Sequence, residues 1–257
     1  MLGTHSWKFV KKILYLGEPI YKIVDSGGVT HRFCNEQAVQ ILANDGFFKE
    51  ADFFKKNLLP LNDGVCWADH AWKCLAHYFD PDTGNGLGIF PDAVTEGMYY
   101  FNKSLFMWRE GKTYESLFFL GACLHIVQDL CVPYHASLAA FNGHQEFESW
   151  ARKNRFSYRV FSDGLYCKNY NSFELAECWM RENARKAKKF FLPVIQGKKE
   201  DYFDYTSSEL LTLAQKTTSG FMQFYYSLTN NPEPVFNERA NFFEPFRTHF
   251  LPLKPLF

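Results

Sequence analysis

The segment FLGACLHIVQD, residues 119–129, decides the fold of this chain. Its apolar residues belong to a predicted helix from Thr113 to Leu130, the most apolar helix in the sequence, and Pro133 prevents a simple continuation. The pattern is helical almost everywhere after residue 30. The sequence therefore predicts an all-α protein with a single compact multi-helix domain over residues 1–257.

Further helices follow from apolar residues at helical spacing and from turn-forming residues between them. One is expected to begin at Asn35 and to end at Asn44-Asp45-Gly46, and the others to cover residues 47–58 (ending before Pro60), 67–79, 91–109, 146–153, 172–191 and 207–228. Two segments are exceptions. We expect residues 1–30 to be irregular or a hairpin, and the Pro- and Phe-rich residues 232–257 to be a tail packed on the bundle.

The central segment carries two residues that can bind a metal. His125 and Asp129 are four residues apart, so both side chains lie on one face of the helix, one turn from each other. Both can therefore reach one ion. The small residues Gly121 and Ala122 on that helix would let neighbouring helices approach closely around it.

More residues of the same kind lie on either side. His135 follows the break at Pro133, and His144 and Glu148 are again four residues apart on the next predicted helix. Upstream, Asp69 and His77 are eight residues apart, about two helical turns. Imidazole nitrogens and carboxylate oxygens without thiolates suit zinc in a hydrolytic site. A single such histidine is more often a hydrogen-bonded residue than a ligand, but the group together predicts metal binding.

Composition argues against several other functions. The chain has 28 basic and 28 acidic residues, so it has no excess of positive charge that would favour binding to nucleic acid. Its seven cysteines form no C-x-x-C pair, which predicts buried thiols rather than a disulfide framework or a thiolate zinc site. The N-terminus does not have the pattern of a signal peptide, and no stretch approaches the ~18 apolar residues of a transmembrane helix.

The sequence resembles the bacterial zinc-dependent phospholipases C, a family related in fold to the single-strand-specific nucleases of the S1/P1 type. The resemblance is carried by AHYFDPDTG (76–84), by FLGACLHIVQD (119–129) with VPYHA (132–136), and by the looser flanks THRF (30–33) and His144 to Glu148. It extends from about His31 to the last long helix. It implies a zinc-dependent phosphodiester hydrolase, in particular a phospholipase C that acts on phospholipid headgroups.

The resemblance also implies two or three zinc ions per chain. By this comparison the first ion would be held by Asp69, His77, His125 and Asp129, the second by His135, His144 and Glu148, and the third by His31 and a shared Asp129. In the family the third ion is completed by an N-terminal tryptophan. Trp7 is the nearest candidate here, but it is neither the first residue nor close to His31, so the third site departs from the family pattern.

The resemblance assigns a catalytic role to Asp69, which would act both as a zinc ligand and as the base that orients or deprotonates the attacking water. It does not extend to a choline headgroup. The two aromatic side chains that enclose choline in the best-known members correspond here to His70 and Cys74.

Two alternatives remain at this point. The same scaffold can support a nuclease or 3′-nucleotidase, with nucleic acid as partner only in that case, or a non-catalytic zinc-stabilised binding module. For the phospholipase C interpretation we expect a phospholipid or other phosphodiester substrate, a monomer, and transient contact with a membrane surface. The Phe-rich C-terminus could supply that contact, although packing on the bundle is favoured. The resemblance suggests secretion, whereas no signal peptide is recognised.

Overall fold

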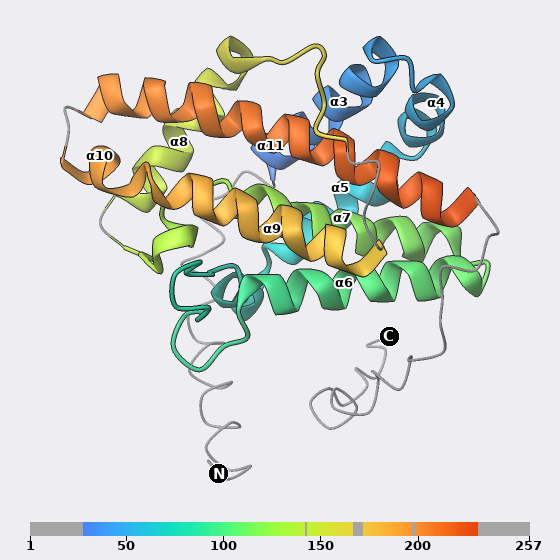
Figure 1. Ribbon diagram of the computed structural model, residues 1–257, viewed down its shortest axis with the longest axis horizontal. Coiled ribbons are helices and arrows are strands. Elements are labelled where there is room, and N and C mark those ends of the chain that lie inside the picture. Colours follow the sequence, from blue (N-terminus) through green and yellow to red (C-terminus); the bar gives the residue numbers. More distant parts are fainter. Residues whose placement is uncertain (1–27, 142, 167–171, 197–198, 231–257) are drawn as a thin grey trace, which may run out of the picture.

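The structure is a computed structural model that describes residues 28–141, 143–166, 172–196 and 199–230. Within these ranges every regular element is helical, which confirms the all-α prediction (Figure 1). The α-helices are α3 (Val29–Asn44), α4 (Phe48–Lys56), α5 (Leu58–Ala68), α6 (Ala93–Arg109), α7 (Thr113–Asp129), α8 (His144–Asn154), α9 (Ser172–Lys188), α10 (Phe191–Gln196) and α11 (Lys199–Asn230), and the 3-10 turns are η1 (Ala71–Ala76), η2 (His135–Ser137) and η3 (Arg155–Tyr158).

Parts of the sequence predictions lie outside the described residues. These are most of the expected N-terminal hairpin, including Trp7, and the C-terminal tail 232–257. Within the described part, α3 begins at Val29, so the last two residues of the segment 1–30 are helical and not irregular as expected.

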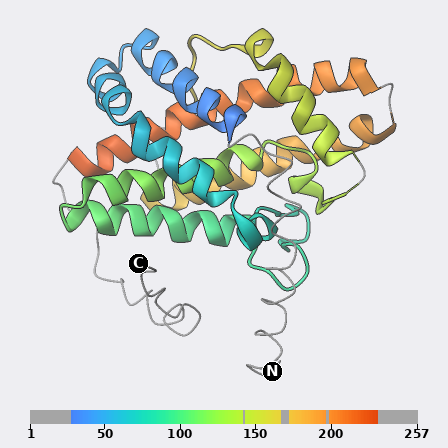
Figure 2. The ribbon, with the colours of Figure 1, turned by 180° about the vertical axis from the view of Figure 1, so that it is seen from behind.

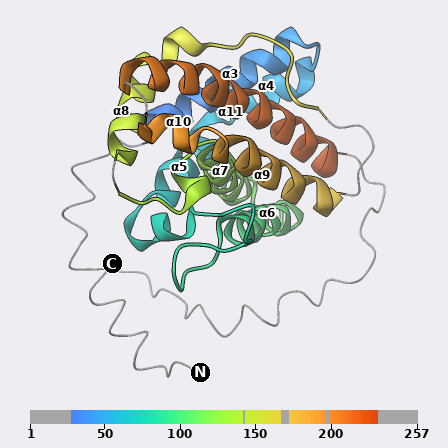
Figure 3. The ribbon, with the colours of Figure 1, turned by 60° about the vertical axis from the view of Figure 1, so that its left-hand side comes forward.

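The helix predicted from residues 119–129 is the centre of the bundle. Every residue from Leu120 to Leu130 is buried. Helices α5 and α6 pack along α7, and α3, α9 and α11 also contact it. Figure 2 shows α5 crossing α7, and Figure 3 shows α6 and α7 nearly end-on, running alongside each other.

Two glycines allow α5 and α7 to approach closely. A Cβ atom built on Gly121 would lie 2.0 Å from the backbone oxygen of Leu61, and one on Gly64 would lie 1.9 Å from the backbone oxygen of Phe118. Because real Cβ atoms do not come so close, each position requires glycine. The two helices therefore meet backbone to backbone, and the expectation that Gly121 permits close approach agrees with this contact.

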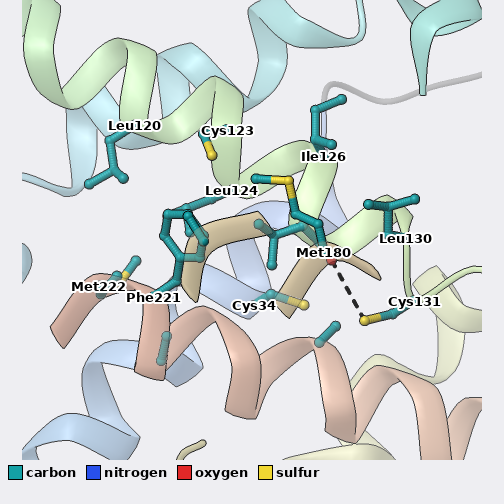
Figure 4. Close-up of a cluster of buried hydrophobic side chains, with 14 of the residues drawn as sticks. Cys34, Leu120, Cys123, Leu124, Ile126, Leu130, Cys131, Met180, Phe221 and Met222 are labelled. Atoms are coloured by element: carbon teal, nitrogen blue, oxygen red, sulfur yellow. Dashed lines mark hydrogen bonds between the residues drawn. The ribbon is translucent and has the colours of Figure 1, made fainter. Parts of the chain in front are cut away.

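The core beside α7 consists of aliphatic, aromatic and sulfur-containing side chains. Figure 4 shows Leu124 and Ile126 of α7 with Met180 of α9 and Phe221 of α11, all of them buried. Of the six cysteines in the described residues, Cys34, Cys123 and Cys131 are buried, and none of the six is in a disulfide. The prediction of buried thiols is correct for these three.

The largest error in the helix predictions concerns residues 57–79. The helix expected over 47–58 corresponds to α4, which ends at Lys56, before Pro60 as predicted. The unexpected element is α5, which has Pro60 in its first turn, where its missing N–H needs no partner. The predicted helix 67–79 does not exist as one element, because α5 ends at Ala68 and His70 is extended (φ −81°, ψ 135°). The chain then folds back, with the Lys73 ammonium 4.6 Å from the centre of the Trp67 ring.

The C-terminal helices also differ from the prediction. The helix expected over 172–191 ends at Lys188, and α11 begins at Lys199 rather than at residue 207. Acidic Glu200 and Asp201 suit the first turn of α11, and Phe203 is buried against Phe147 of α8. None of the helices in the described part of the chain has the length and apolar character needed to cross a bilayer.

The contact between α5 and α7 gives a first prediction. Gly121→Ala should lower the free energy of unfolding by about 2–3 kcal/mol, because the new methyl group must push the two backbones apart. Denaturant unfolding followed by circular dichroism measures this. Gly111→Asn is the control, since Gly111 has φ +71° and open space around its Cβ position, and asparagine tolerates that backbone conformation. Equal stability of Gly121→Ala and the wild type would contradict the contact.

Candidate metal centre

The fold brings together all eight metal-capable residues that the sequence singles out. They form three groups in which the potential ligand atoms lie within 4.8 Å of one another. The first is Asp69, His77 and His125, the second is His135, His144 and Glu148, and the third is His31, His125 and Asp129. The first and third share His125, and Asp129 also contacts His77 of the first. The groups come from the first turn of α3, the ends of α5 and η1, the C-terminal half of α7, the turn η2 and the first half of α8.

The first group surrounds the end of α7. Nδ1 of His77 and Nε2 of His125 lie 3.2 Å apart, and they lie 2.8 Å and 3.0 Å from Oδ2 of Asp129. Oδ1 of Asp69 is 3.9 Å from Nε2 of His125. His77 and His125 are almost completely buried, whereas the side chain of Asp69 is 28% exposed. This group is therefore closed on the protein side and open at Asp69.

The second group lies where η2 meets α8. Nε2 of His144 lies 3.1 Å from Nε2 of His135 and 2.7 Å from Oε1 of Glu148. Oε1 of Glu148 is 3.4 Å from Nε2 of His135. The two histidines are buried, and the side chain of Glu148 is 45% exposed. Like the first group, it opens on the side of its carboxylate.

Asp129 connects the groups. Its Oδ2 faces His77 and His125 and lies 3.8 Å from Nε2 of His135, while its Oδ1 is 3.4 Å from Nε2 of His31. The rings of His31 and His125 are stacked with their centres 4.0 Å apart. A single buried carboxylate thus contacts side chains of all three groups.

Hydrogen bonds behind the histidines fix which nitrogen faces the centre. Nδ1 of His135 donates to the backbone oxygen of His77 at 3.1 Å, and Nδ1 of His31 donates to Oε1 of Gln128 at 2.8 Å. In both rings Nε2 is then the acceptor and faces the carboxylates. Gln128 was not among the predicted site residues. Its position beside Asp129 is the only sign of a role in the sequence, and no neighbouring residue indicates what it bonds to.

Gln128 is itself held by two buried side chains. Its amide nitrogen donates to Oδ1 of Asn35 and to Oγ1 of Thr218, each at 3.1 Å. Asn35 also donates to Oδ1 of Asn62 at 3.1 Å. This network joins α3, α5, α7 and α11 behind His31, and outer partners of this kind orient metal ligands.

The comparison with known families agrees with the donor set. The sequence profile described as "Zinc dependent phospholipase C" matches residues 30–209, more than half of the chain. The chain belongs to the zinc-dependent phospholipase C family. It is therefore a zinc-dependent enzyme of the phosphodiester-hydrolysing kind, as the sequence predicted, and neither the nuclease nor the non-catalytic module is favoured.

Individual relatives are also phospholipases C. In an alignment 228 positions long, the chain is 28% identical to a phospholipase C of Listeria monocytogenes, and the alignment covers 78% of each chain. In one 270 positions long, gaps included, it is 25% identical to a phospholipase C of Clostridium perfringens, with 91% of this chain and 66% of that protein covered. Among solved structures, alpha-toxins of Clostridium absonum and Clostridium perfringens have the same fold, with TM-scores of 0.74 and 0.71 and identities of 21% and 22%. They are matched over 83% and 81% of this chain and 67% and 66% of their own.

The geometry of the donors fits the zinc that the family requires. Tetrahedral zinc with bonds of about 2.0–2.1 Å holds its ligand atoms roughly 3.3 Å apart. In the second group the donor atoms are 2.7–3.4 Å apart, and in the first group His77, His125 and Asp129 are 2.8–3.2 Å apart. Three lone-pair donors facing one point are the arrangement that a cation stabilises. Cys74 belongs to none of the three groups, and burial, with the nearby Asp69, raises the pKa of its thiol to about 12.

The charge states of His77 and Asp129 suit metal binding in this phospholipase C family member. Burial lowers the pKa of His77 to about 4, although Asp129 opposes the effect. Burial alone would raise the pKa of Asp129, but His125 and His135 hold it well below its usual value. A neutral imidazole and an ionised carboxylate are the forms that bind a metal.

A salt bridge holds the loop that follows His77. Nζ of Lys188 on α9 lies 2.5 Å from Oδ1 of Asp80 and 2.7 Å from Oδ2 of Asp82. Burial alone would raise the pKa of Asp80, but the hydrogen bonds from Lys188 and from the backbone N–H of Asp82 lower it. This pair links the segment after a metal-facing histidine to the bundle.

Lys188→Met should therefore lower the free energy of unfolding at neutral pH, by about 1 kcal/mol because the pair is partly exposed. The folded pKa of Asp80 lies below its unfolded value of about 3.9, so its contribution is present above that pH and is lost as pH falls through the folded pKa. Urea unfolding at a series of pH values measures the difference between variant and wild type, which should shrink below about pH 4. Lys189→Met is the control. A pH-independent difference would contradict the pairing.

Metal content tests the donor set directly. Elemental mass spectrometry of the purified protein should detect two or three zinc ions per chain, and His125→Ala and His144→Ala should each reduce that content, because each removes a donor from a different group. His70→Ala is the matched control, since His70 is exposed and belongs to none of the groups. Absence of zinc after reconstitution would refute the assignment.

Proposed function

We propose that the eight side chains bind the zinc ions and that Asp69 is the catalytic residue of a phospholipase C. The observation that carries this proposal is the graded exposure of the donors. His77, His125 and Asp129 are buried, whereas Asp69, His31 and Glu148 are 28%, 17% and 45% exposed at the side chain. A substrate phosphate must therefore approach from the side of these three residues.

Zinc bound at these donors would bind phosphate oxygens and lower the pKa of a bound water toward about 7. The chain's own residues supply position and proton transfer. Oδ1 of Asp69 lies farther from Nε2 of His125 than Nδ1 of His77 and Oδ2 of Asp129 do. The exposure of Asp69 also leaves one side of its carboxylate open. These two features support Asp69 as both a ligand and the group that orients the water and accepts its proton.

The proposed substrate is a phospholipid, in keeping with the family. Two positions that bear on the headgroup are His70, which is exposed, and Cys74, whose thiol stays protonated. Neither supplies the aromatic face that attracts a quaternary ammonium group. We therefore do not extend the proposal to choline lipids in particular.

The proposed active unit is one chain. All eight donors come from a single copy, and the described helices share one principal hydrophobic core except α8 and α10, which pack around a smaller cluster that includes Phe147, Val194 and Phe203 of α11. These two facts support a monomer and a single domain, since no second chain or separate unit is needed to complete the site.

The role of Asp69 can be separated from that of a simple ligand. Asp69→Asn should reduce kcat on a phospholipid substrate by about 100-fold or more while most of the zinc remains bound, because the amide cannot accept the proton. Turnover and zinc content are measured on the same preparation. Asp63→Asn removes the same charge from α5 and serves as control. Proportional loss of zinc and activity would make Asp69 a ligand only.

A further inference from the structure

Beyond the metal centre, the segment that follows Glu148 has a distinctive charge. Residues 149–162 contain Arg152, Lys153, Arg155 and Arg159 and no carboxylate, although the whole chain is neutral. Within the part of the chain that the structure describes, Lys153, Arg155 and Arg159 form no ion pair. Cations that are not neutralised internally are available to an external anion.

The arginines are arranged around an exposed aromatic ring. The guanidinium carbons of Arg155 and Arg159 lie 4.1 Å and 4.7 Å from the centre of the Phe156 ring, which is 52% exposed. Phe161, five residues later, is 56% exposed. We call Lys153, Arg155, Phe156, Arg159 and Phe161 the basic–aromatic surface.

This surface is built on a firm support. The Phe156 ring packs edge-on against buried Phe33 of α3, with ring centres 5.6 Å apart. Nη1 of Arg155 donates to the backbone oxygen of Arg152 at 2.5 Å, and Nδ2 of Asn44 donates to the backbone oxygen of Phe161 at 2.7 Å. The cations and rings are thus held in place before any partner binds, which reduces the entropy that binding would cost.

The surface lies beside the opening of the metal centre. Glu148 and Arg155 are seven residues apart along α8 and its continuation into η3, so they lie on the same face and about 10 Å apart along the axis. Figures 1 and 3 show α8 and the turn after it at one edge of the bundle, next to α3.

We propose that the basic–aromatic surface docks this enzyme on anionic lipid membranes, with the guanidinium groups at the lipid phosphates and the two phenylalanines in the headgroup region. Charge complementarity selects this partner, because a surface of unpaired cations attracts anionic lipid and exposed aromatic rings partition into the membrane interface. Docking there would bring the opening of the metal centre toward the bilayer. The biological purpose of docking rests on the proposed phospholipid substrate, but membrane binding itself can be measured without any hydrolysis.

One other basic surface provides the comparison. A groove of about 360 Å³ between α9 and α11 is lined by Lys186, Lys189 and Lys216 over an apolar floor that includes Leu213. It also contains Glu209, and the one aromatic ring in its lining, Phe190, is partly buried. If net charge alone drove membrane binding, this groove would contribute as much as the basic–aromatic surface.

The experiment measures partition onto vesicles that the enzyme cannot hydrolyse. Vesicles of digalactosyl diacylglycerol, with or without about a third of the anionic sulfoquinovosyl diacylglycerol, contain no phosphodiester, so binding is separated from catalysis. The zinc-loaded protein should sediment with the anionic vesicles and not with the neutral ones, and binding should weaken as salt is added. Arg155→Gln/Arg159→Gln should lower the partition coefficient roughly 30-fold, as expected for two cations at an anionic surface.

Two variants serve as controls. Lys186→Gln/Lys189→Gln removes the same charge from the groove and should change binding less than about twofold. Arg155→Lys/Arg159→Lys keeps both charges and should retain most of the binding, which guards against a loss that reflects misfolding alone. Thermal unfolding confirms that each variant is folded.

Three outcomes would overturn the proposal. They are equal losses in the two glutamine variants, equal binding of the wild type to neutral and anionic vesicles, and tighter binding of the wild type to a single-stranded oligonucleotide than to anionic vesicles. Hydrolysis of monomeric dihexanoyl phospholipids with choline, ethanolamine, serine and glycerol headgroups by the wild type is measured separately. Failure to hydrolyse any of them would refute the proposed function and leave the docking result intact.

Discussion

The buried carboxylate of Asp129 is the constraint on which the rest of the structure depends. An ionised carboxylate inside a protein is costly unless it is paired, and here four histidines from four elements surround it. His31, His77, His125 and His135 lie within hydrogen-bond or ion-pair distance of its two oxygens. The two oxygens of Asp129 are therefore the point at which side chains from α3, η1, α7 and η2 meet. A cation bound there would offset the repulsion among the lone pairs of these oxygens and nitrogens.

Such a carboxylate requires a helix that lies deep inside the bundle, and glycine makes that depth possible. The backbones of α5 and α7 touch at Gly64 and Gly121, and Asp129 lies eight residues, about two turns, beyond Gly121 on the same helix. Close packing at one point of α7 thus fixes the height at which the donors of its last turn meet the other helices. The polar network of Gln128, Asn35 and Thr218 fixes the rotation of that last turn.

The features that could be predicted from the sequence are those that depend on residues close together in the chain. His125 with Asp129, and His144 with Glu148, follow from helical periodicity, which depends only on neighbours in the chain. His31 came from resemblance alone, because its partners are distant in sequence. Asp69 and His77 were also paired by helical spacing, but α5 ends at Ala68, so the two residues meet without sharing a helix. The break after Ala68 could not be predicted, since no glycine or proline marks it and side-chain packing of Lys73 on Trp67 accompanies it.

The same reasoning explains which parts of the surroundings were missed. Gln128 bonds to residues 93 and 90 positions away, so nothing near it in the sequence indicates a role. The arginines after Glu148 can be read from the sequence, but their stacking on Phe156 cannot. It depends on the 3-10 turn η3, which follows α8 without a proline or glycine to mark it. Long-range packing decides these features, and single-sequence patterns carry little information about it.

The donors of the metal centre extend from residue 31 to residue 148, and no disulfide joins any of the cysteines that the structure describes. Zinc ions bound by these donors would therefore be cross-links that close several long loops, and their binding free energy would add to the stability of the fold. In this respect zinc does for the bundle what oxidation does for a small disulfide-rich domain. Removal of zinc would then lower the stability of the fold as well as abolish activity.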